Sequence, residues 1–385
     1  MESHEIEITD LSHDGRGVAR IGGKTVFVAG ALPGERAIVR IGTRHRSFDE
    51  ARVETLLTRS PERIEPRCPH FGVCGGCALQ HLPPAAQIAA KQRVLAENFE
   101  RIGKVEPQRW LEPLADAPWG YRRKGRLSVK WVAKKGKVLV GFREDNPRFV
   151  ADLSVCYTLL PEVGERIAAL SELVTSLEAH ELIAQIEISA GDATVALIFR
   201  NLRPLSEADS AKLIAFGQAN DLAILVQPGG PDTVQALWPE RVDLSFRIED
   251  ADVEIAFKPL DFVQVNAGMN RRMIARAREN AASNGIGNAE FAAADLAADQ
   301  RNAPWATRDY EKLLLDPPRS GAAAVLEYLP RKATQCVVYV SCHPGSLARD
   351  AGTLVQQHGF KLVAAGVMDM FPHTAHVESI ALFER

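Results

Sequence analysis

The sequence predicts an α/β protein in three parts: a small N-terminal β-barrel, an α+β central part and a C-terminal α/β sheet. Three observations lead to this prediction. Short strands broken by Gly and Pro fill 5–57, helices alternate with strands through 160–258, and near-continuous apolar runs alternate with helices after 312. With 385 residues, 46 % hydrophobic and 25 % charged, the chain has the composition of a globular protein of two or three domains.

Changes in this pattern set the expected domain boundaries. We expect a β-barrel over 1–58, a central domain over 59–258 and an α/β domain over 259–385. A Pro-rich stretch with three cysteines follows the barrel. After it, a helical pattern over 84–102 carries an Ala/Leu/Ile face, which we expect to pack on the last domain.

Charge and hydropathy exclude some locations but few functions. The net charge of −3 does not indicate a nucleic-acid binder, although a local basic surface can lie on an acidic protein. One such stripe, late in the barrel, runs from Arg36 to Arg46, and a solvated strand face explains it equally well. The start of the chain is acidic and polar, and no apolar run approaches the ~20 residues of a membrane span. We therefore expect a cytoplasmic protein.

Four of the six cysteines form a candidate metal site. Cys68-x5-Cys74-x2-Cys77 is a tight triple in a loop rich in Pro and Gly, and Cys156 lies far downstream. In a reducing cytosol, clustered thiols indicate metal binding or catalysis rather than disulfides. Three close ligands and a remote one favour a [4Fe–4S] cluster over zinc, which usually takes two Cys-x2-Cys pairs. Zinc remains an alternative, as do unrelated buried cysteines, above all for Cys156.

Chemically reactive residues stand at strand ends in the last third. Asp316 follows the apolar run 312–315, and Cys342 ends another run and leads into a helix near 346–358. In sheets of this type, ligands lie beyond the carboxyl ends of the strands, and a helix N-terminus can stabilise a thiolate. Glu378, just before the final strand, can act as a general base. The structural alternatives are a buried thiol and a surface or capping carboxylate.

Together these residues resemble the RNA uracil-5-methyltransferase family. The resemblance covers nearly the whole chain and rests on the segments 262–266, 315–321, 339–344 and 370–379. The four cysteines match the cluster ligands of its iron–sulfur members, and the barrel is similar to a TRAM domain, a small RNA-binding module. This combination is typical of the branch that methylates 23S ribosomal RNA.

The resemblance implies a cofactor, a partner and roles for individual residues. Cys342 matches the nucleophile that adds to uracil C6, and Glu378 matches the base that removes the C5 proton. Gln264, Asp295 and Asp316 match positions that bind S-adenosylmethionine or the uracil. The family also implies a Rossmann-like catalytic domain, 23S ribosomal RNA as substrate, a base flipped out of its stack and a monomer. Segment 121–126 is a candidate phosphate contact, or else a solvated basic loop.

One departure from the family pattern concerns the cofactor. In the family, a Gly-rich turn after one strand lets the cofactor approach the protein backbone. An acidic residue at the end of the next strand binds the ribose hydroxyls of the cofactor. Here Gln264 and Asn266 run into Asn280 through one expected helix over 269–282. A strand–helix–strand unit needs ~30 residues or more, so we infer an internal deletion and an incomplete sheet. The two resulting hypotheses are an active methyltransferase and a catalytically impaired RNA-binding remnant.

Overall fold

The computed structural model describes most of the chain, namely residues 3–248, 253–269, 301–303, 305–329 and 332–385. Most of the expected helix over 269–282, and Asp295, lie outside the described residues. The chain divides into two compact units. The first unit comprises 1–64, 81–116 and 280–385, and the second comprises 65–80 and 117–279. Among the described helices, none has both the length and the apolar character that a membrane span requires.

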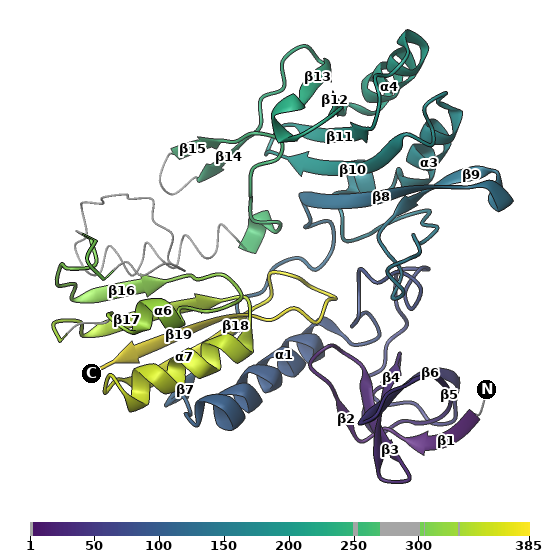
Figure 1. The fold of residues 1–385 in the computed structure, drawn as a ribbon. Helices are drawn as coiled ribbons and strands as arrows, with labels where there is room; N and C mark the ends of the chain where they lie inside the picture. The colour runs from purple at the N-terminus through teal and green to yellow at the C-terminus, as the bar shows by residue number, and fades with distance from the viewer. Residues whose placement is uncertain (1–2, 249–252, 270–300, 304, 330–331) are drawn as a thin grey trace. The chain divides into compact units, whose positions relative to one another are not determined.

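The N-terminal strands of the first unit form a half-barrel (Figure 1). Its sheet has the order β1-β5-β6-β4-β3-β2, with bounds Ser3–Glu7 (β1), Asp10–Leu11 (β2), Gly17–Ile21 (β3), Lys24–Ala29 (β4), Arg36–Arg44 (β5) and Phe48–Leu56 (β6). Alternate side chains, including Ile8, Val26 and Val39, are buried in a core of their own. Glu35 is fully buried and pairs with Arg63, which fixes the chain as it leaves the half-barrel.

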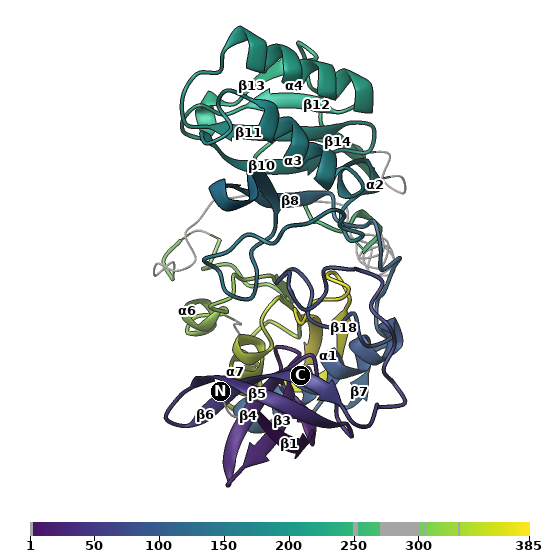
Figure 2. The same cartoon turned by 90° about the vertical axis from the view of Figure 1, so that its right-hand side faces the viewer.

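The second unit combines a mixed sheet with helices, and its bounds differ from the central domain expected over 59–258. Its main sheet has the order β13-β12-β11-β10-β8-β9, with bounds Lys124–Val132 (β8), Lys137–Gly141 (β9), Ile183–Ala190 (β10), Val195–Asn201 (β11), Ala223–Val226 (β12) and Gln235–Trp238 (β13). The helices α3 (Ile167–Ser176) and α4 (Glu207–Asn220) lie on one face (Figure 2). There Leu170 and Leu213 join the largest core of the protein.

Shorter elements complete the second unit. These are α2 (Pro161–Gly164), the 3-10 turns η2 (Ala133–Lys135) and η3 (Pro231–Thr233), and the hairpin of β14 (Ser245–Ile248) with β15 (Val253–Ala256). A smaller core containing Ile198 and Leu225 lies on the sheet face away from α3 and α4.

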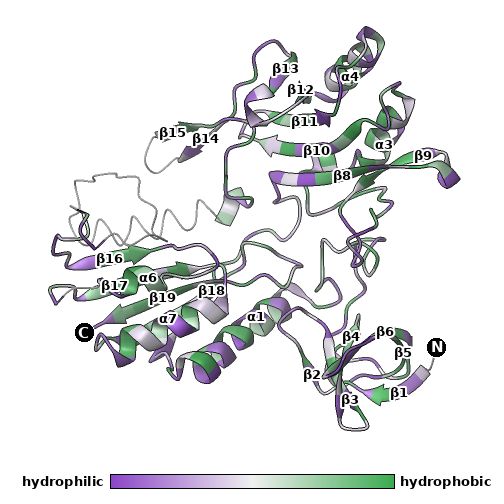
Figure 3. Ribbon diagram, viewed as in Figure 1, coloured by the Kyte–Doolittle hydropathy of each residue, from purple (hydrophilic) through white to green (hydrophobic). Residues whose placement is uncertain are grey.

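The C-terminal strands of the first unit form the sheet that carries the predicted catalytic residues. Its order is β16-β17-β19-β18-β7, with bounds Arg109–Trp110 (β7), Lys312–Leu315 (β16), Cys336–Ser341 (β17), Lys361–Met368 (β18) and Glu378–Glu384 (β19). β16 and β17 are parallel, and β19 runs antiparallel to both of its neighbours. Hydrophobic residues predominate in β16 and β19 (Figure 3). Within the described residues β16 ends the sheet, and its Leu314 side chain is 70 % exposed.

Helices α1 (Pro84–Asn98), α6 (Ala323–Leu326) and α7 (Pro344–Gln356) pack on this sheet. The π-turn η1 (Phe99–Gly103) continues α1 and comes so close to α7 that a Cβ on Gly103 would lie 2.5 Å from the Ala348 carbonyl oxygen. Leu95 of α1 and Leu347 of α7 belong to the same buried core. The helix predicted over 84–102 is therefore an α-helix that ends in a π-turn.

Candidate active site

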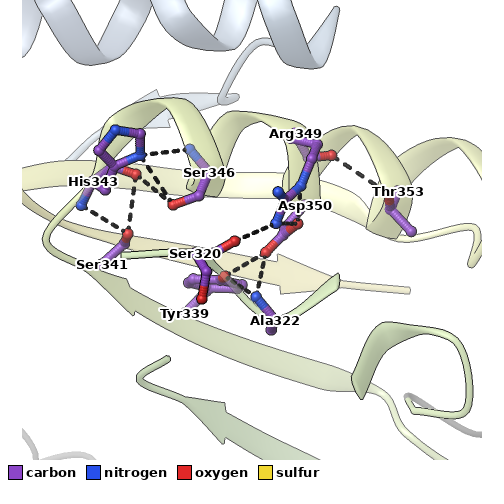
Figure 4. Close-up of polar contacts among 9 residues, drawn as sticks. All are labelled: Ser320, Ala322, Tyr339, Ser341, His343, Ser346, Arg349, Asp350 and Thr353. Atoms are coloured by element: carbon purple, nitrogen blue, oxygen red, sulfur yellow. Dashed lines mark hydrogen bonds and ion pairs between the residues drawn. The ribbon is translucent and has the colours of Figure 1, made fainter. Parts of the chain in front are cut away.

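Cys342 lies between β17 and α7, in a short turn with a fixed backbone. The Ser341 hydroxyl accepts a hydrogen bond from the His343 N–H at 3.1 Å. His343 then caps α7 by accepting the Ser346 N–H at its Nδ1 atom, 3.1 Å away (Figure 4). Pro344 occupies the first helical turn, where a missing N–H leaves no hydrogen bond unmade. Both neighbours of the thiol are thus held in place.

The charges around Cys342 act in opposite directions. Burial raises the pKa of the Cys342 thiol, and the carboxylate of Glu378 raises it further, whereas a hydrogen bond and the charge of Arg319 lower it. The net effect of these groups raises the pKa of Cys342, and stabilisation of its thiolate by the helix N-terminus stays a prediction. Arg319 is therefore the side chain that favours the reactive thiolate. Its Nη2 atom also lies 3.2 Å from Nδ1 of His376.

Glu378 is the first residue of β19 and faces Met368 of β18 in the sheet register. Burial raises the pKa of Glu378 to about 7, Asp316 adds to the rise, and Arg319 and Lys91 oppose it. A carboxyl group with a pKa near the operating pH is well suited to accept a proton and release it again. Because Glu378 acts on the pKa of Cys342 and Asp316 acts on that of Glu378, these three predicted residues share one site.

Asp316 follows β16 and begins a rigid turn. Pro317 and Pro318 have no N–H groups to satisfy, and the Gly321 N–H closes the turn on the Pro318 carbonyl oxygen at 2.8 Å. Gly321 has a φ of +83°, and a Cβ there would lie 2.6 Å from a carboxylate oxygen of Asp350. The turn therefore requires glycine at this position. Burial raises the pKa of Asp316.

A buried carboxylate on α7 holds the turn after β16 (Figure 4). Asp350, which is 1 % exposed, accepts hydrogen bonds from the Ala322 N–H at 2.7 Å and from the Tyr339 hydroxyl at 2.5 Å. Arg349 donates to the Ser320 carbonyl oxygen at 2.9 Å. One helix thus fixes both the turn after β16 and the turn that carries the nucleophile candidate.

The other two predicted cofactor positions are Gln264 and Asp295. Gln264 belongs to the second unit, where the Arg123 N–H donates to the carbonyl oxygen of Val265 at 2.9 Å. Asp316 belongs to the first unit, and Asp295 lies outside the described residues. The roles of Gln264, Asp295 and Asp316 in cofactor binding therefore stay predictions.

The four predicted metal ligands all belong to the second unit. Burial raises the pKa of Cys77 to about 12, and Cys156, Cys74 and Cys68 each add to the rise, so the four thiols lie near one another. Positive φ at Gly72, and a Cβ on Gly76 only 3.3 Å from the Cys74 sulfur, show why glycines surround the triple. Across the described residues, no three His, Cys, Asp or Glu side chains are close enough to hold a single metal ion.

All four cations of the basic segment 121–126 have partners within the second unit. The contacts are Arg123 with Asp192 at 2.8 Å, Arg126 with Glu187 at 2.9 Å, Lys124 with the carbonyl oxygen of Pro259 at 2.8 Å, and Arg122 over the ring of Phe142 at 5.3 Å. These side chains tie β8 to its neighbours. From the sequence we predicted either a phosphate contact or a solvated loop for this segment, and we had not considered pairing within the protein.

Two cations of the site were missed by sequence reasoning. Arg319 lies in the Asp-Pro-Pro-Arg motif, but an arginine in a loop gives no sign of a contact with a cysteine 23 positions later. Lys91 interrupts the apolar face of α1, and it is only 2 % exposed. A lysine on an otherwise apolar helix face was the available signal, because such a group is buried only with a partner.

Comparison with protein-family models places two known regions in the chain. The model "TRAM domain" matches residues 2–53, which include the half-barrel. The model "tRNA (Uracil-5-)-methyltransferase" matches residues 304–385, which include β16 to β19 and the three residues of the shared site.

Curated relatives match over the full length of the chain. A protein of Xylella fastidiosa strain 9a5c, "23S rRNA (uracil(1939)-C(5))-methyltransferase RlmD", is 54 % identical and covers 100 % of this chain and 98 % of its own. A protein of the same name from Xanthomonas axonopodis pv. citri is 55 % identical, covering 98 % and 96 %. The Xylella alignment spans 432 residues against 385 here. More than forty positions of that relative therefore have no counterpart in this chain.

A solved structure shares the fold. It is Pyrococcus abyssi tRNA (uracil-54, C5)-methyltransferase in complex with S-adenosyl-L-homocysteine, with a TM-score of 0.70 over 98 % of this chain and 99 % of that one. At 20 % sequence identity, this similarity supports the fold and nothing about function.

Proposed function

Because the chain belongs to the family of the 23S rRNA (uracil-C5)-methyltransferases called RlmD, we propose that it methylates C5 of the uridine at position 1939 of 23S ribosomal RNA. The observation that carries the chemistry is the shared site of Cys342, Glu378 and Asp316. A nucleophile beside a carboxyl group with a pKa of about 7 suits a reaction that needs addition followed by proton removal. In this chemistry S-adenosylmethionine supplies the methyl group.

The residues of this chain activate the uracil and release the product. The Cys342 thiolate, favoured by Arg319, adds to C6 of the flipped-out base, and the electron pair of the C5–C6 double bond moves into an enolate. C5 thereby becomes nucleophilic. Once C5 is substituted, the Glu378 carboxylate removes the C5 proton, and the bond between sulfur and C6 breaks. The free thiolate and the aromatic base are restored together.

The cofactor side of the site fits less well than the uracil side. Asp316 belongs to the first unit, and Gln264 belongs to the second. The Gly-rich unit that should follow Asn266 is absent from the sequence, and the relatives contain more than forty positions that this chain lacks. Leu314 of β16 is 70 % exposed, whereas helices normally cover the side chains on both faces of a parallel sheet. The described residues therefore do not complete a cofactor site.

A second candidate function follows from this incomplete site. The alternative is a catalytically impaired remnant that keeps the half-barrel and the cysteine set and binds ribosomal RNA without turnover. The shortened segment between Asn266 and Asn280 is the observation that favours it.

Two assays on unmodified 23S rRNA separate these candidates. Methyl incorporation from radiolabelled S-adenosylmethionine requires the whole site. Release of tritium from C5 of the labelled uridine in the absence of cofactor requires only reversible thiolate addition and proton exchange at C5. We expect tritium release from either form with an intact uracil site, and methyl incorporation only from an active methyltransferase. If the protein binds RNA but shows neither tritium release nor methyl incorporation, it is the RNA-binding remnant.

We also propose that Cys68, Cys74, Cys77 and Cys156 hold a [4Fe–4S] cluster. Their mutual effect on pKa supports one shared site. In a tetrahedral zinc site the sulfurs lie about 3.8 Å apart, from Zn–S bonds of about 2.3 Å. In the described residues no trio of ligands lies close enough for a single metal ion, so the proposal of a cluster rests on the sequence spacing of the four cysteines.

Anaerobic purification should therefore yield a brown protein with iron–sulfur absorption and four irons per chain. Cys74→Ser should lose this absorption, because a hydroxyl is a poor ligand for the cluster, while Cys336→Ser, a cysteine in the other unit, should retain it. Bound zinc in a colourless protein would refute the cluster.

The remaining features of the proposal concern organisation and partners. We propose that the half-barrel within 1–58 binds ribosomal RNA, that 59–258 carries the cluster and that 259–385 carries the reaction. The protein would act as a monomer in the cytoplasm, where ribosomal RNA is made and modified.

A further inference from the structure

Helix α1 places polar side chains on its buried face. The buried residues of this helix are Gln87, Lys91 and Leu95, which are four positions apart and therefore lie on one stripe. A helix that packs on a sheet normally buries an apolar stripe. Two of the three residues here are polar, and one of them is a lysine that is only 2 % exposed. A buried ammonium group is costly unless it is paired, so its partners indicate its role.

The partners of Lys91 lie in the turn that precedes Glu378. The Lys91 ammonium contacts Asp369 at 2.6 Å and donates to the carbonyl oxygen of Phe371 at 2.9 Å. Asp369 is itself 4 % exposed. It directly follows Met368, which faces Glu378 across the β18–β19 pair. Lys91 therefore binds Asp369, which is next to Met368, the residue that faces the proposed base Glu378 across the strand pair.

Gln87 holds the same turn one helical turn earlier. Its side-chain oxygen accepts the His373 N–H at 2.8 Å, and its Nε2 atom lies 3.1 Å from the His373 Nδ1 atom. His373 has a φ of +67°, a left-handed conformation that a residue other than glycine rarely adopts. The turn from 369 to 376 is thus held at two points by α1, and Glu378 begins the strand that follows it.

The charge of Lys91 also reaches Glu378. Among the described residues, the ionisable side chains that interact with Glu378 include Asp316, Arg319, Lys91 and Cys342. Asp316 opposes the ionised carboxylate, and Arg319 and Lys91 favour it. Arg319 also hydrogen-bonds to the thiol, whereas Lys91 is bound on the other side by Asp369. Lys91 therefore has no task in the uracil chemistry described above, although it acts on the base.

We propose that Lys91 is a positioning residue for Glu378, which fixes the turn before it and favours its proton-accepting form. The inference rests on the proposed function only in calling Glu378 the base. The positioning itself concerns groups of the first unit and can be measured without substrate.

The test is a titration of Glu378 in the full-length protein. Carbon-13 NMR of protein labelled at the glutamate carboxyl carbons gives the pKa, and the signal lost in Glu378→Gln assigns it. In Lys91→Met the pKa of Glu378 should rise by about one unit, since an opposite charge is removed from its surroundings. Lys91→Arg keeps the charge and should leave the pKa close to that of the wild type. Arg93→Met is the matched control, because Arg93 lies on the exposed side of α1 and pairs with Asp10.

A double variant and a second assay complete the test. Lys91→Met leaves Asp369 buried without its cation, so the double variant Lys91→Met with Asp369→Asn removes both charges if the single variant does not fold. An unchanged Glu378 pKa in a folded Lys91→Met variant would overturn the inference. If only the double variant folds, a Glu378 pKa no higher than that of Asp369→Asn alone would overturn it. In the tritium-release assay, the low-pH limb of the rate profile should shift to higher pH by the same amount. A pKa shift without any tritium release even in the wild type would refute the proposed function and leave the positioning role intact.

Discussion

Cys342→Ala is expected to reduce both methyl incorporation and cofactor-free tritium release to background. The reason is that both reactions begin with the bond between sulfur and C6, and no other side chain of the shared site can form it. Tritium release from C5-labelled 23S rRNA, measured with and without S-adenosylmethionine, checks the prediction. RNA affinity should stay within a few-fold of the wild type, because one thiol adds little to a large, mostly electrostatic interface.

Cys336→Ala is the matched control for this experiment. Cys336 is the first residue of β17, and its half-buried thiol lies at the opposite end of the strand from the nucleophile candidate. Loss of a thiol should not matter there. Equal activity of Cys342→Ala and the wild type would eliminate covalent catalysis by this residue.

Glu378→Gln should lower tritium release by about 10²–10⁴-fold, the usual contribution of a positioned general base. The amide keeps the shape of the side chain but cannot take the C5 proton. Where methyl transfer occurs, the thiolate should remain bound to C6, so a protein–RNA adduct that survives denaturing gel electrophoresis should accumulate. Glu384→Gln, an exposed position at the other end of β19, provides the control.

The pH profile gives this prediction a second readout. The pKa of Glu378 is raised to about 7, so its carboxylate is lost as pH falls through about 7. If Glu378 is the base, the wild-type rate should fall below that pH, and Glu378→Gln should lack this limb. A rate that is independent of pH between 6 and 8 in the wild type would assign proton removal to another group.

The mixed α/β fold could be predicted because local signals carry it, whereas the roles of Cys342, Glu378 and Asp316 rest on the resemblance to the family and stay predictions. Apolar runs predict β16 and β17, and a reactive residue directly after each run indicates the edge of a sheet where ligands bind. The partners of these residues could not be predicted in the same way. Lys91 is 278 positions from Asp369, and a contact over such a distance leaves no pattern in either segment. We predicted a barrel where the structure has a half-barrel. The spacing of strands in the sequence predicts the strands, but it does not show whether the first and last strands pair to close the barrel.

The direction of the Cys342 pKa shows a different limit of sequence reasoning. A cysteine before a helix suggests a stabilised thiolate, but the result depends on how deeply the thiol is buried and on the position of Glu378. Neither quantity can be read from one segment. The π-turn at η1 was not predicted either, and its last residue, Gly103, lies so close to α7 that a side chain there would meet the Ala348 carbonyl oxygen.

The uncovered leucine on β16 has a practical consequence for anyone who handles this protein. Leu314 offers a large apolar side chain to solvent on the outermost described strand of a sheet, and such strands recruit other chains through their free backbone groups. Concentrated samples should therefore tend to aggregate and precipitate. A lysine at this position should improve yield and keep preparations clear, which makes Leu314→Lys a useful background for the measurements described above.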